Sequence, residues 1–190
     1  MKKYALNAVF ITGFYCLPAI TTPTDDIIII QPSTPLHFQS IQEIIINNSF
    51  QFQLIPSISE QDAKQQLLEQ HELDDIINMP DCYFNNHGTF LVMLQESQVI
   101  GMGGLQYFSQ GICELRRICF AQSHHGKGLG KRMVIMLIEQ AKLLGYKKMR
   151  LWVYNPHTQG AAVALYKKLG FYDIAPYVAC KGQLFMEKEL

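Results

Sequence analysis

Runs of apolar residues, divided by short polar or glycine turns, fill much of the middle of the chain. Their close succession predicts three strands of an antiparallel meander, Thr89–Leu94, Val99–Tyr107 and Ile112–Phe120. The earlier stretch Ile27–Gln31 predicts a strand buried on both faces, because its isoleucines are continuous rather than alternating with polar residues. Glycines within Gly101–Gly104 predict a bulge or a close backbone approach in the second meander strand.

Further elements are predicted on both sides of the meander. Before it, a short helix is expected around Phe38 and Ile41–Ile46. After it, a helix over Gln159–Leu169 is stopped by Gly170. Three more strands are expected toward the C-terminus: Lys148–Val153, Phe171–Ala175 and Gln183–Glu189.

Two longer helices are predicted from apolar spacing and end signals. Ser59 can cap a helix over Ser59–Ile77, with Asp62 in the capping-box position. The predicted apolar face of this helix is Leu67, Leu68 and Ile76. The segment Met133–Leu143 is amphipathic and ends at Gly145. Its predicted apolar face is Ile135, Leu137, Ile138 and Leu143.

The order of these elements predicts one α/β (α+β) domain with antiparallel pairs and at least one strand-helix-strand crossover. A polar break, Thr21–Asp26, separates an N-terminal extension, residues 1–26, from the domain, residues 27–190. In the extension, Lys2 and Lys3 precede the apolar run Tyr4–Ile20, which is a weak signal-peptide pattern. We expect a cytoplasmic protein, with export as the alternative if residues 1–21 act as a signal.

The charges of the chain cancel, since it has 16 basic and 16 acidic residues. We therefore expect no nucleic-acid partner and no stable membrane association. The five cysteines are scattered without a C-x-x-C pair, which argues against a disulfide framework or a zinc cluster. His124 and His125 have no carboxylate or cysteine at a helpful spacing, so we expect a solvated loop and no metal.

A glycine loop connects the strand Ile112–Phe120 to the following helix. Within His125–Lys131, glycine occupies positions 126, 128 and 130, so the backbone can approach a ligand with its N–H groups converging. The helix N-terminus behind the loop, together with Lys127, Lys131 and Arg132, favours an anion such as pyrophosphate. The spacing fits neither a P-loop nor a dinucleotide fingerprint. The alternative is a flexible turn that binds nothing.

Three linked segments resemble the GNAT superfamily of N-acetyltransferases. They are Glu114–Phe120, the loop His125–Gly130, and Ala161–Phe171 with its A-L-Y-x-x-L-G-F pattern. The resemblance extends from about Ile27 to the C-terminus. It implies the GNAT fold, a mixed and mostly antiparallel sheet of about six to seven strands flanked by about four helices. It also implies acetyl-CoA as the cosubstrate.

The same resemblance implies a set of cofactor contacts. In the family's loop pattern, Q/R-x-x-G-x-G/A, backbone amides bind the pyrophosphate, and here the first position is His125. By analogy, the strand before the loop splays from its neighbour, which leaves amides free for the pantetheine arm and the acetyl carbonyl. Many relatives carry Asn where Gln159 stands. The implied cofactor-binding residues are Ile118, Phe120, His125, Gly126, Lys127, Gly128, Gly130, Lys131 and Gln159.

Two residues are candidates for the chemistry of acetyl transfer to an amine. Tyr166 matches the family's tyrosine that donates a proton to the CoA sulfur; the alternative is an aromatic that only packs. Glu114 shares its register with the catalytic glutamate of histone-acetylating members. It could accept the amine proton, or it could be a strand carboxylate paired to Arg116 or Arg117.

The resulting hypothesis is an acetyl-CoA-dependent N-acetyltransferase that passes the acetyl group directly to an amine in a ternary complex. The acceptor classes left open are a small-molecule amine, a free amino acid and a peptide N-terminus. We expect the acceptor to meet the segments Phe50–Ser57 and Asp81–Asn86. The alternative function is a non-catalytic acyl-CoA-binding module of the same fold. The oligomeric state is left open between a monomer and a homodimer.

Overall fold

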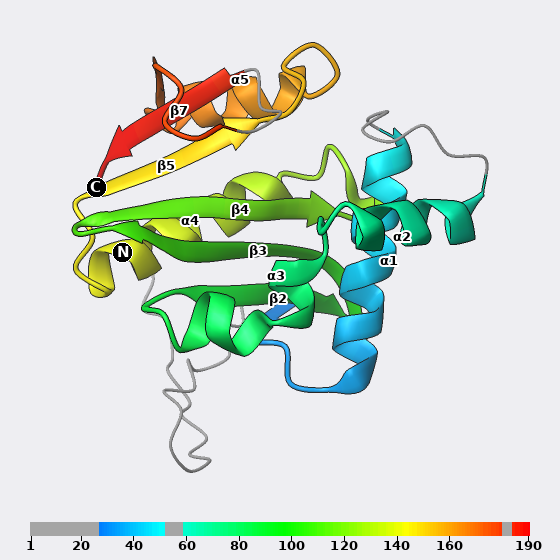
Figure 1. The fold of residues 1–190 in the computed structure, drawn as a ribbon. Coiled ribbons are helices and arrows are strands. Elements are labelled where there is room, and N and C mark those ends of the chain that lie inside the picture. The colour runs from blue at the N-terminus through cyan, green and yellow to red at the C-terminus, as the bar shows by residue number, and fades with distance from the viewer. Residues whose placement is uncertain (1–26, 52–58, 180–183) are drawn as a thin grey trace.

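The computed structural model describes residues 27–51, 59–179 and 184–190, and these form a seven-stranded sheet in the order β1-β2-β3-β4-β5-β7-β6 (Figure 1). Neighbouring strands are antiparallel except β4 and β5, which are parallel. The mixed, mostly antiparallel sheet is therefore confirmed. The strands are β1 (Ile27–Ile30), β2 (Thr89–Gln95), β3 (Gln98–Ser109), β4 (Ile112–Phe120), β5 (Lys148–Val153), β6 (Tyr172–Ile174) and β7 (Leu184–Glu189).

Helices cover both faces of the sheet (Figure 1). One face carries α1 (Pro35–Gln51), α2 (Glu60–Glu69), α3 (Asp74–Ile77) and a π-helical turn, η1 (Pro80–Phe84). The other carries α4 (Leu129–Leu143) and α5 (Gly160–Lys168), and a 3₁₀ turn, η2 (Gln122–His124), precedes α4. The crossover β4-α4-β5 is the predicted strand-helix-strand unit. No helix in the described ranges is both long and apolar enough to cross a bilayer.

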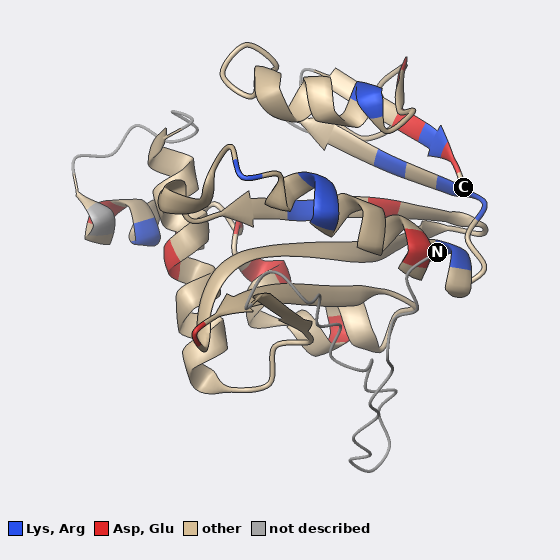
Figure 2. Ribbon diagram, turned by 180° about the vertical axis from the view of Figure 1, so that it is seen from behind, with Lys and Arg blue, Asp and Glu red and all other residues tan. Residues whose placement is uncertain are grey.

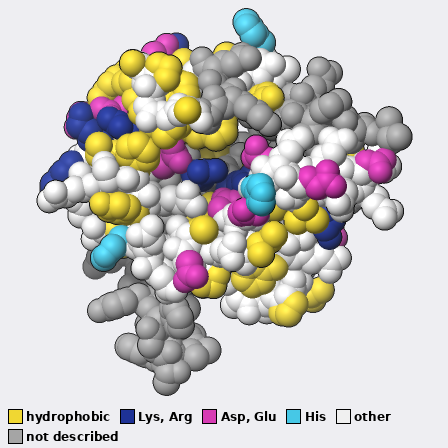
Figure 3. All heavy atoms as spheres, viewed as in Figure 1, with side chains coloured by type: hydrophobic (Ala, Val, Ile, Leu, Met, Phe, Trp, Pro, Cys, Tyr) yellow, Lys and Arg dark blue, Asp and Glu magenta, His cyan; other side chains and the backbone are white. Residues whose placement is uncertain are grey.

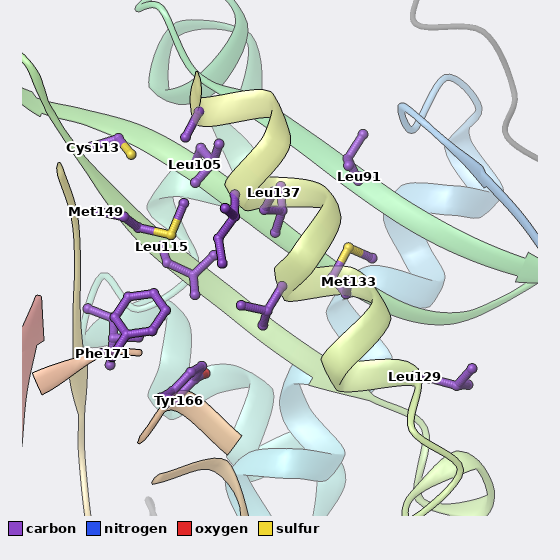
Figure 4. Close-up of a cluster of buried hydrophobic side chains, with 14 of the residues drawn as sticks. Leu91, Leu105, Cys113, Leu115, Leu129, Met133, Leu137, Met149, Tyr166 and Phe171 are labelled. Atoms are coloured by element: carbon purple, nitrogen blue, oxygen red, sulfur yellow. The ribbon is translucent and has the colours of Figure 1, made fainter. Parts of the chain in front are cut away.

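Helix α4 buries a different stripe from the one predicted. Leu137 and Ile138 are buried as expected, but Ile135 is 40% exposed and Leu143 is 78% exposed. The buried stripe repeats every three or four residues: Leu129, Met133, Val134, Leu137, Ile138 and Ala141. These side chains pack with Leu105, Leu115 and Phe171 under the sheet (Figure 4). Because α4 has apolar residues on several sides, its contact with the sheet, rather than hydrophobicity alone, decides which of them are buried.

Strand β1 is buried on one face, so the prediction of burial on both faces was wrong. Ile27 and Ile29 are buried, whereas Ile28 is 39% exposed. β1 is an edge strand, paired through Ile27↔Gln95 and the following residues to β2 alone. The first helix is also longer than expected, since α1 spans 17 residues.

The predicted helix Ser59–Ile77 is broken into α2 and α3. Its start is confirmed, because the Asp62 amide donates to Ser59 Oγ at 3.1 Å. Helix α2 ends in a Schellman pattern, with the His71 amide on the Leu68 carbonyl and the Glu72 amide on the Leu67 carbonyl. His71 takes the left-handed conformation that glycine usually supplies, at φ +59°. The break also leaves Leu68, predicted for the apolar face, 37% exposed.

Strand β4 carries a bulge opposite the glycines of β3, so this bulge lies in the neighbouring strand and not at Gly101–Gly104, where it was predicted. Between the pairs Met102↔Cys119 and Gly104↔Arg116, β3 advances by two residues and β4 by three. The close approach is also present, because a Cβ on Gly101 would lie 2.1 Å from the Phe120 ring. The ring of Phe120 therefore lies directly against the β3 backbone.

Glu187 of β7 accepts hydrogen bonds from three side chains of the neighbouring strands β5 and β6. It is 4% exposed and accepts from Lys148 Nζ at 2.9 Å, Arg150 Nε at 2.7 Å and Tyr172 OH at 2.8 Å. Burial alone would raise the pKa of Glu187, but these donors outweigh burial and lower the pKa from 4.5 to about 2. The ionised carboxylate is therefore the form that stabilises the fold.

The lowered pKa of Glu187 predicts a specific acid sensitivity. Its stabilisation is fully present above pH 4.5, the ordinary pKa, and is lost as the pH falls through about 2. Over that window, wild type should lose up to about 3 kcal/mol more unfolding free energy than Glu187→Gln. Urea titrations of both proteins at several pH values measure this difference. Equal losses in the two proteins would contradict the assignment.

Candidate active site

Strands β4 and β5 run together for three residue pairs and then separate. The parallel ladder joins Ile112↔Lys148, Cys113↔Met149 and Glu114↔Arg150, and it stops there (Figure 1). Beyond it, the two strands and helices α1 and α5 enclose a cleft of about 760 Å³. The divergence expected from the sequence is therefore present.

The end of β4 turns one backbone edge toward this cleft. Ala121 donates its amide to the Ile100 carbonyl of β3 at 2.9 Å, and successive peptide groups of a strand point to opposite sides. The Phe120 carbonyl accepts instead from the side chains of Asn48, at 3.0 Å, and His125, at 2.9 Å. The Phe120 amide, which points the same way as its carbonyl, therefore faces away from β3. Phe120 and Ile118 both line the cleft.

The bulge in β4 is held by a buried ion pair. Arg117 has φ +58°, and its guanidinium donates to Asp75 through Nε at 3.0 Å and Nη2 at 2.6 Å. It also donates to the Glu72 carbonyl in the turn between α2 and α3. Tyr83 OH donates to Asp75 at 2.6 Å. Burial tends to raise the pKa of Asp75, but Arg117 outweighs burial and holds the pKa below its usual value.

The glycine loop lies beside the cleft at the start of α4. Gly126 and Gly128 have φ of +75° and +78°, a conformation that residues with a Cβ rarely adopt. Both glycines are exposed, as are Lys127 and Lys131, and Figure 2 shows basic residues at the loop and the first turn of α4. Of the loop residues, His125 lines the cleft wall. Gly130 faces the side chains of α5 and β4, because a Cβ on it would lie in ordinary contact with them, 3.6 Å from Leu165.

Tyr166 of α5 also lines the cleft. It is 7% exposed and meets the Phe171 ring edge-on at 5.7 Å (Figure 4). Within the described part of the chain, no group hydrogen-bonds its hydroxyl. Burial, and to a lesser degree Cys119, raise the pKa of Tyr166 well above its ordinary value. The phenol is therefore protonated at neutral pH.

Glu114 lies in the same cleft with two partners. It is 6% exposed; its Oε1 accepts from Tyr177 OH at 2.7 Å and its Oε2 from Arg116 at 3.3 Å. Of the two arginines expected as alternatives, Arg116 is the partner and Arg117 is not. The contribution of Tyr177 was missed, because it follows β6 in a segment without a motif.

The remaining predicted residues divide between the cleft and other places. Gln159 lines the cleft, and its Oε1 accepts from the Asn155 amide at 3.1 Å. No residue of Asp81–Asn86 lines it, because η1 packs under β3 through Tyr83. The turn Gln70–Glu72 lines the cleft instead. Of Phe50–Ser57, residues 52–57 lie outside the described residues. His124 Nε2 bonds Gln95 at 3.0 Å, and the described residues contain no cluster suited to a metal.

Solved acetyltransferases share this fold. The chain superposes on an acetyltransferase from Streptococcus agalactiae with a TM-score of 0.70 and 19% identity, covering 87% of this chain and 99% of that one. It superposes on the PaiA N-acetyltransferase from Thermoplasma acidophilum, solved in complex with coenzyme A, with a TM-score of 0.68 and 20% identity, covering 86% and 99%. At these identities the likeness concerns the fold.

Curated relatives match the chain over about half of its length. YjgM of Escherichia coli, an uncharacterized N-acetyltransferase, is 34% identical over 101 residues, which are 52% of this chain and 59% of YjgM. An IAA acetyltransferase of Azospirillum brasilense is 31% identical over 107 residues, which are 53% of this chain and 67% of that protein. The chain thus spans less than two thirds of the length of YjgM.

The family assignment comes from the central part of the chain. The model of the acetyltransferase (GNAT) family matches residues 55–171 of the 190. This range contains β4, the glycine loop, β5 and α5, which line the cleft together with α1. The chain therefore belongs to the acetyltransferase (GNAT) family.

Proposed function

We propose that this protein is an acetyl-CoA-dependent N-acetyltransferase that transfers the acetyl group directly to an amine. The observation that carries the proposal is the separation of β4 from β5 after Glu114, which opens a cleft lined by Phe120 and Tyr166. Family membership and the coenzyme A complex of the PaiA structure support the choice of cosubstrate.

In the proposed complex, backbone donors of β4 and of the loop hold the cosubstrate. The Phe120 amide, turned away from β3, is a donor for the pantetheine arm or the thioester carbonyl. Gly126–Lys131 supplies backbone N–H groups and a helix N-terminus for the pyrophosphate. Lys127 and Lys131 add positive charge there. The His125 side chain donates to the Phe120 carbonyl, which fixes the start of the loop against β4.

The transfer step forms a C–N bond and breaks the C–S bond. The neutral amine attacks the thioester carbonyl, and the proton that the nitrogen loses passes to Glu114, directly or through water. Tyr166 donates its phenolic proton to the departing sulfur. Its raised pKa keeps the phenol protonated at neutral pH, so the proton is present when the cosubstrate binds. The phenol is then reprotonated from solvent.

Direct transfer is proposed over an acyl-enzyme because of the three cysteines in the described residues. The pKa of Cys119, which lines the cleft, is raised by burial to about 11. Burial also raises the pKa of Cys113 to about 12 and the pKa of Cys82. A thiol in this state is a poor nucleophile at neutral pH, since the thiolate is the reactive form.

The second candidate is a non-catalytic acyl-CoA-binding module of the same fold. One feature favours it: His125 stands at the first loop position in place of Gln or Arg. Its ring bonds to the protein's own Phe120 carbonyl. Both candidates bind acetyl-CoA, and they differ in turnover.

Thermal unfolding with and without acetyl-CoA tests the shared part of both candidates. At 100 times its Kd, acetyl-CoA should stabilise the protein by roughly 2.7 kcal/mol. ATP and NAD serve as control nucleotides and should give no shift, because the loop fits neither of their motifs. Release of the CoA thiol with a panel of amines then separates the candidates. Binding without turnover on any amine would favour the module.

Glu114→Gln tests the proposed base. The rate should fall near neutral pH and recover at high pH, where the amine acceptor is deprotonated without help. The measurement is kcat/KM against pH for both proteins, with a urea titration alongside. If the variant instead loses stability and its rate stays low at every pH, Glu114 has a structural role through Tyr177 and Arg116.

A further inference from the structure

The acceptor side of the cleft has two arginines in different states. Figure 3 shows basic side chains in the hollow of the molecule, surrounded by acidic side chains and a histidine. Arg116 and Arg117 both line the cleft. Arg117 is already paired, because its guanidinium binds both carboxylate oxygens of Asp75 and the Glu72 carbonyl. Arg116 has a single contact in the described ranges, Nη1 to Glu114 at 3.3 Å.

Glu114 accepts a hydrogen bond from only one of the donors of the Arg116 guanidinium. A guanidinium has five N–H donors in a planar fork that matches a carboxylate with two parallel bonds. Glu114 offers one long contact, since its other oxygen accepts from Tyr177 at 2.7 Å. The Arg116 side chain is 29% exposed at the cleft wall, so its remaining donors are accessible to a ligand.

A carboxylate also lines this cleft. Glu72 lines it from the turn between α2 and α3, and its carboxylate has no partner among the residues that the structure describes. A cleft lined by both a cation and an anion is complementary to a zwitterion. A simple amine would leave the remaining donors of Arg116 without an anion in a partly desolvated site.

We propose that the acceptor is an amine that also carries a carboxylate, as a free amino acid does, and that Arg116 binds this carboxylate. The proposal rests on the proposed acetyltransferase function and narrows its acceptor class. Arg116 is then a residue that determines acceptor specificity, next to Glu114 as the base for the amine of the same molecule.

The test compares matched acceptors, the standard L-amino acids and their C-terminal amides. In wild type, kcat/KM should be at least about ten-fold higher for the acids that react than for their amides, because charged hydrogen bonds are lost in the amides. In Arg116→Gln the ratio of acid to amide should fall toward one, mainly through KM for the acid. Arg116→Lys should keep part of the ratio. Lys142→Gln, which removes a charge outside the cleft, should keep all of it.

The results that would contradict the role of Arg116 differ from those that would contradict the proposed acetyltransferase function. A wild-type preference for amides or simple amines, or an equal loss for acid and amide in Arg116→Gln, would overturn the role of Arg116 while leaving the acetyltransferase intact. Stabilisation by acetyl-CoA without turnover of any acid, amide or simple amine would overturn both proposals in favour of the binding module. Absence of stabilisation by acetyl-CoA would reject the proposed function itself.

Discussion

Replacing Asp75 with alanine is expected to lower the free energy of unfolding by about 3–5 kcal/mol, because it leaves a buried arginine without its anion. The Arg117 side chain is 15% exposed, and both of its carboxylate contacts are to Asp75. Arg117 also sits at φ +58°, so the same ion pair holds the strained residue of the bulge. Urea unfolding of the variant measures the loss.

Two further variants make the Asp75 result specific. Asp74→Ala removes a neighbouring carboxylate that is 53% exposed and paired to His71, and it should cost less than about 1 kcal/mol. The double variant Asp75→Ala/Arg117→Met should be less destabilised than the sum of its single changes, because it removes the uncompensated charge. Similar small losses for Asp74→Ala and Asp75→Ala would contradict a buried, energetically important pair.

Replacing Tyr166 with phenylalanine is expected to lower kcat ten-fold or more while acetyl-CoA still stabilises the protein. The change removes the hydroxyl that would protonate the departing sulfur. Because burial raises the pKa of Tyr166, the loss should extend through neutral and moderately alkaline pH. The hydroxyl has no partner within the described residues, so the variant should fold normally.

Steady-state kinetics and thermal unfolding of the same samples separate chemistry from binding in this variant. Tyr107→Phe is a matched control, since Tyr107 is 42% exposed on β3 and does not line the cleft. It should leave kcat unchanged. Unchanged turnover in Tyr166→Phe would remove Tyr166 from the mechanism, and a matching loss of acetyl-CoA stabilisation would assign it to binding.

Much of the fold could be predicted because its signals are local. The ends of α4 and α5 are marked by Gly145 and Gly170, at φ +85° and +87°, and both were predicted. The end of α2 has the same geometry, but His71 supplies the left-handed residue, so no glycine marked it. The turn after it is bonded to Arg117 far along the chain, which local patterns do not encode.

The candidate site could be predicted to the level of its motifs. The strand, loop and helix around Phe120, His125 and Tyr166 do meet at one cleft, as the spacing of the three segments indicated. Strand alternation places Glu114 and Arg116 on one face of β4, so their pairing follows from the sequence, whereas the contact of Glu114 with Tyr177 could not be derived, because Tyr177 lies in a segment without a motif.

The short ladder between β4 and β5 has a consequence for the whole molecule. β5, β7 and β6 form one half-sheet and β1 to β4 form the other, joined by three residue pairs. Beyond these three pairs, each half-sheet has a backbone edge that no strand of the described chain covers. A ligand bound in the cleft would contact both of these backbone edges and so connect the two half-sheets. The substrate would therefore hold the two halves of the protein together as well as react there.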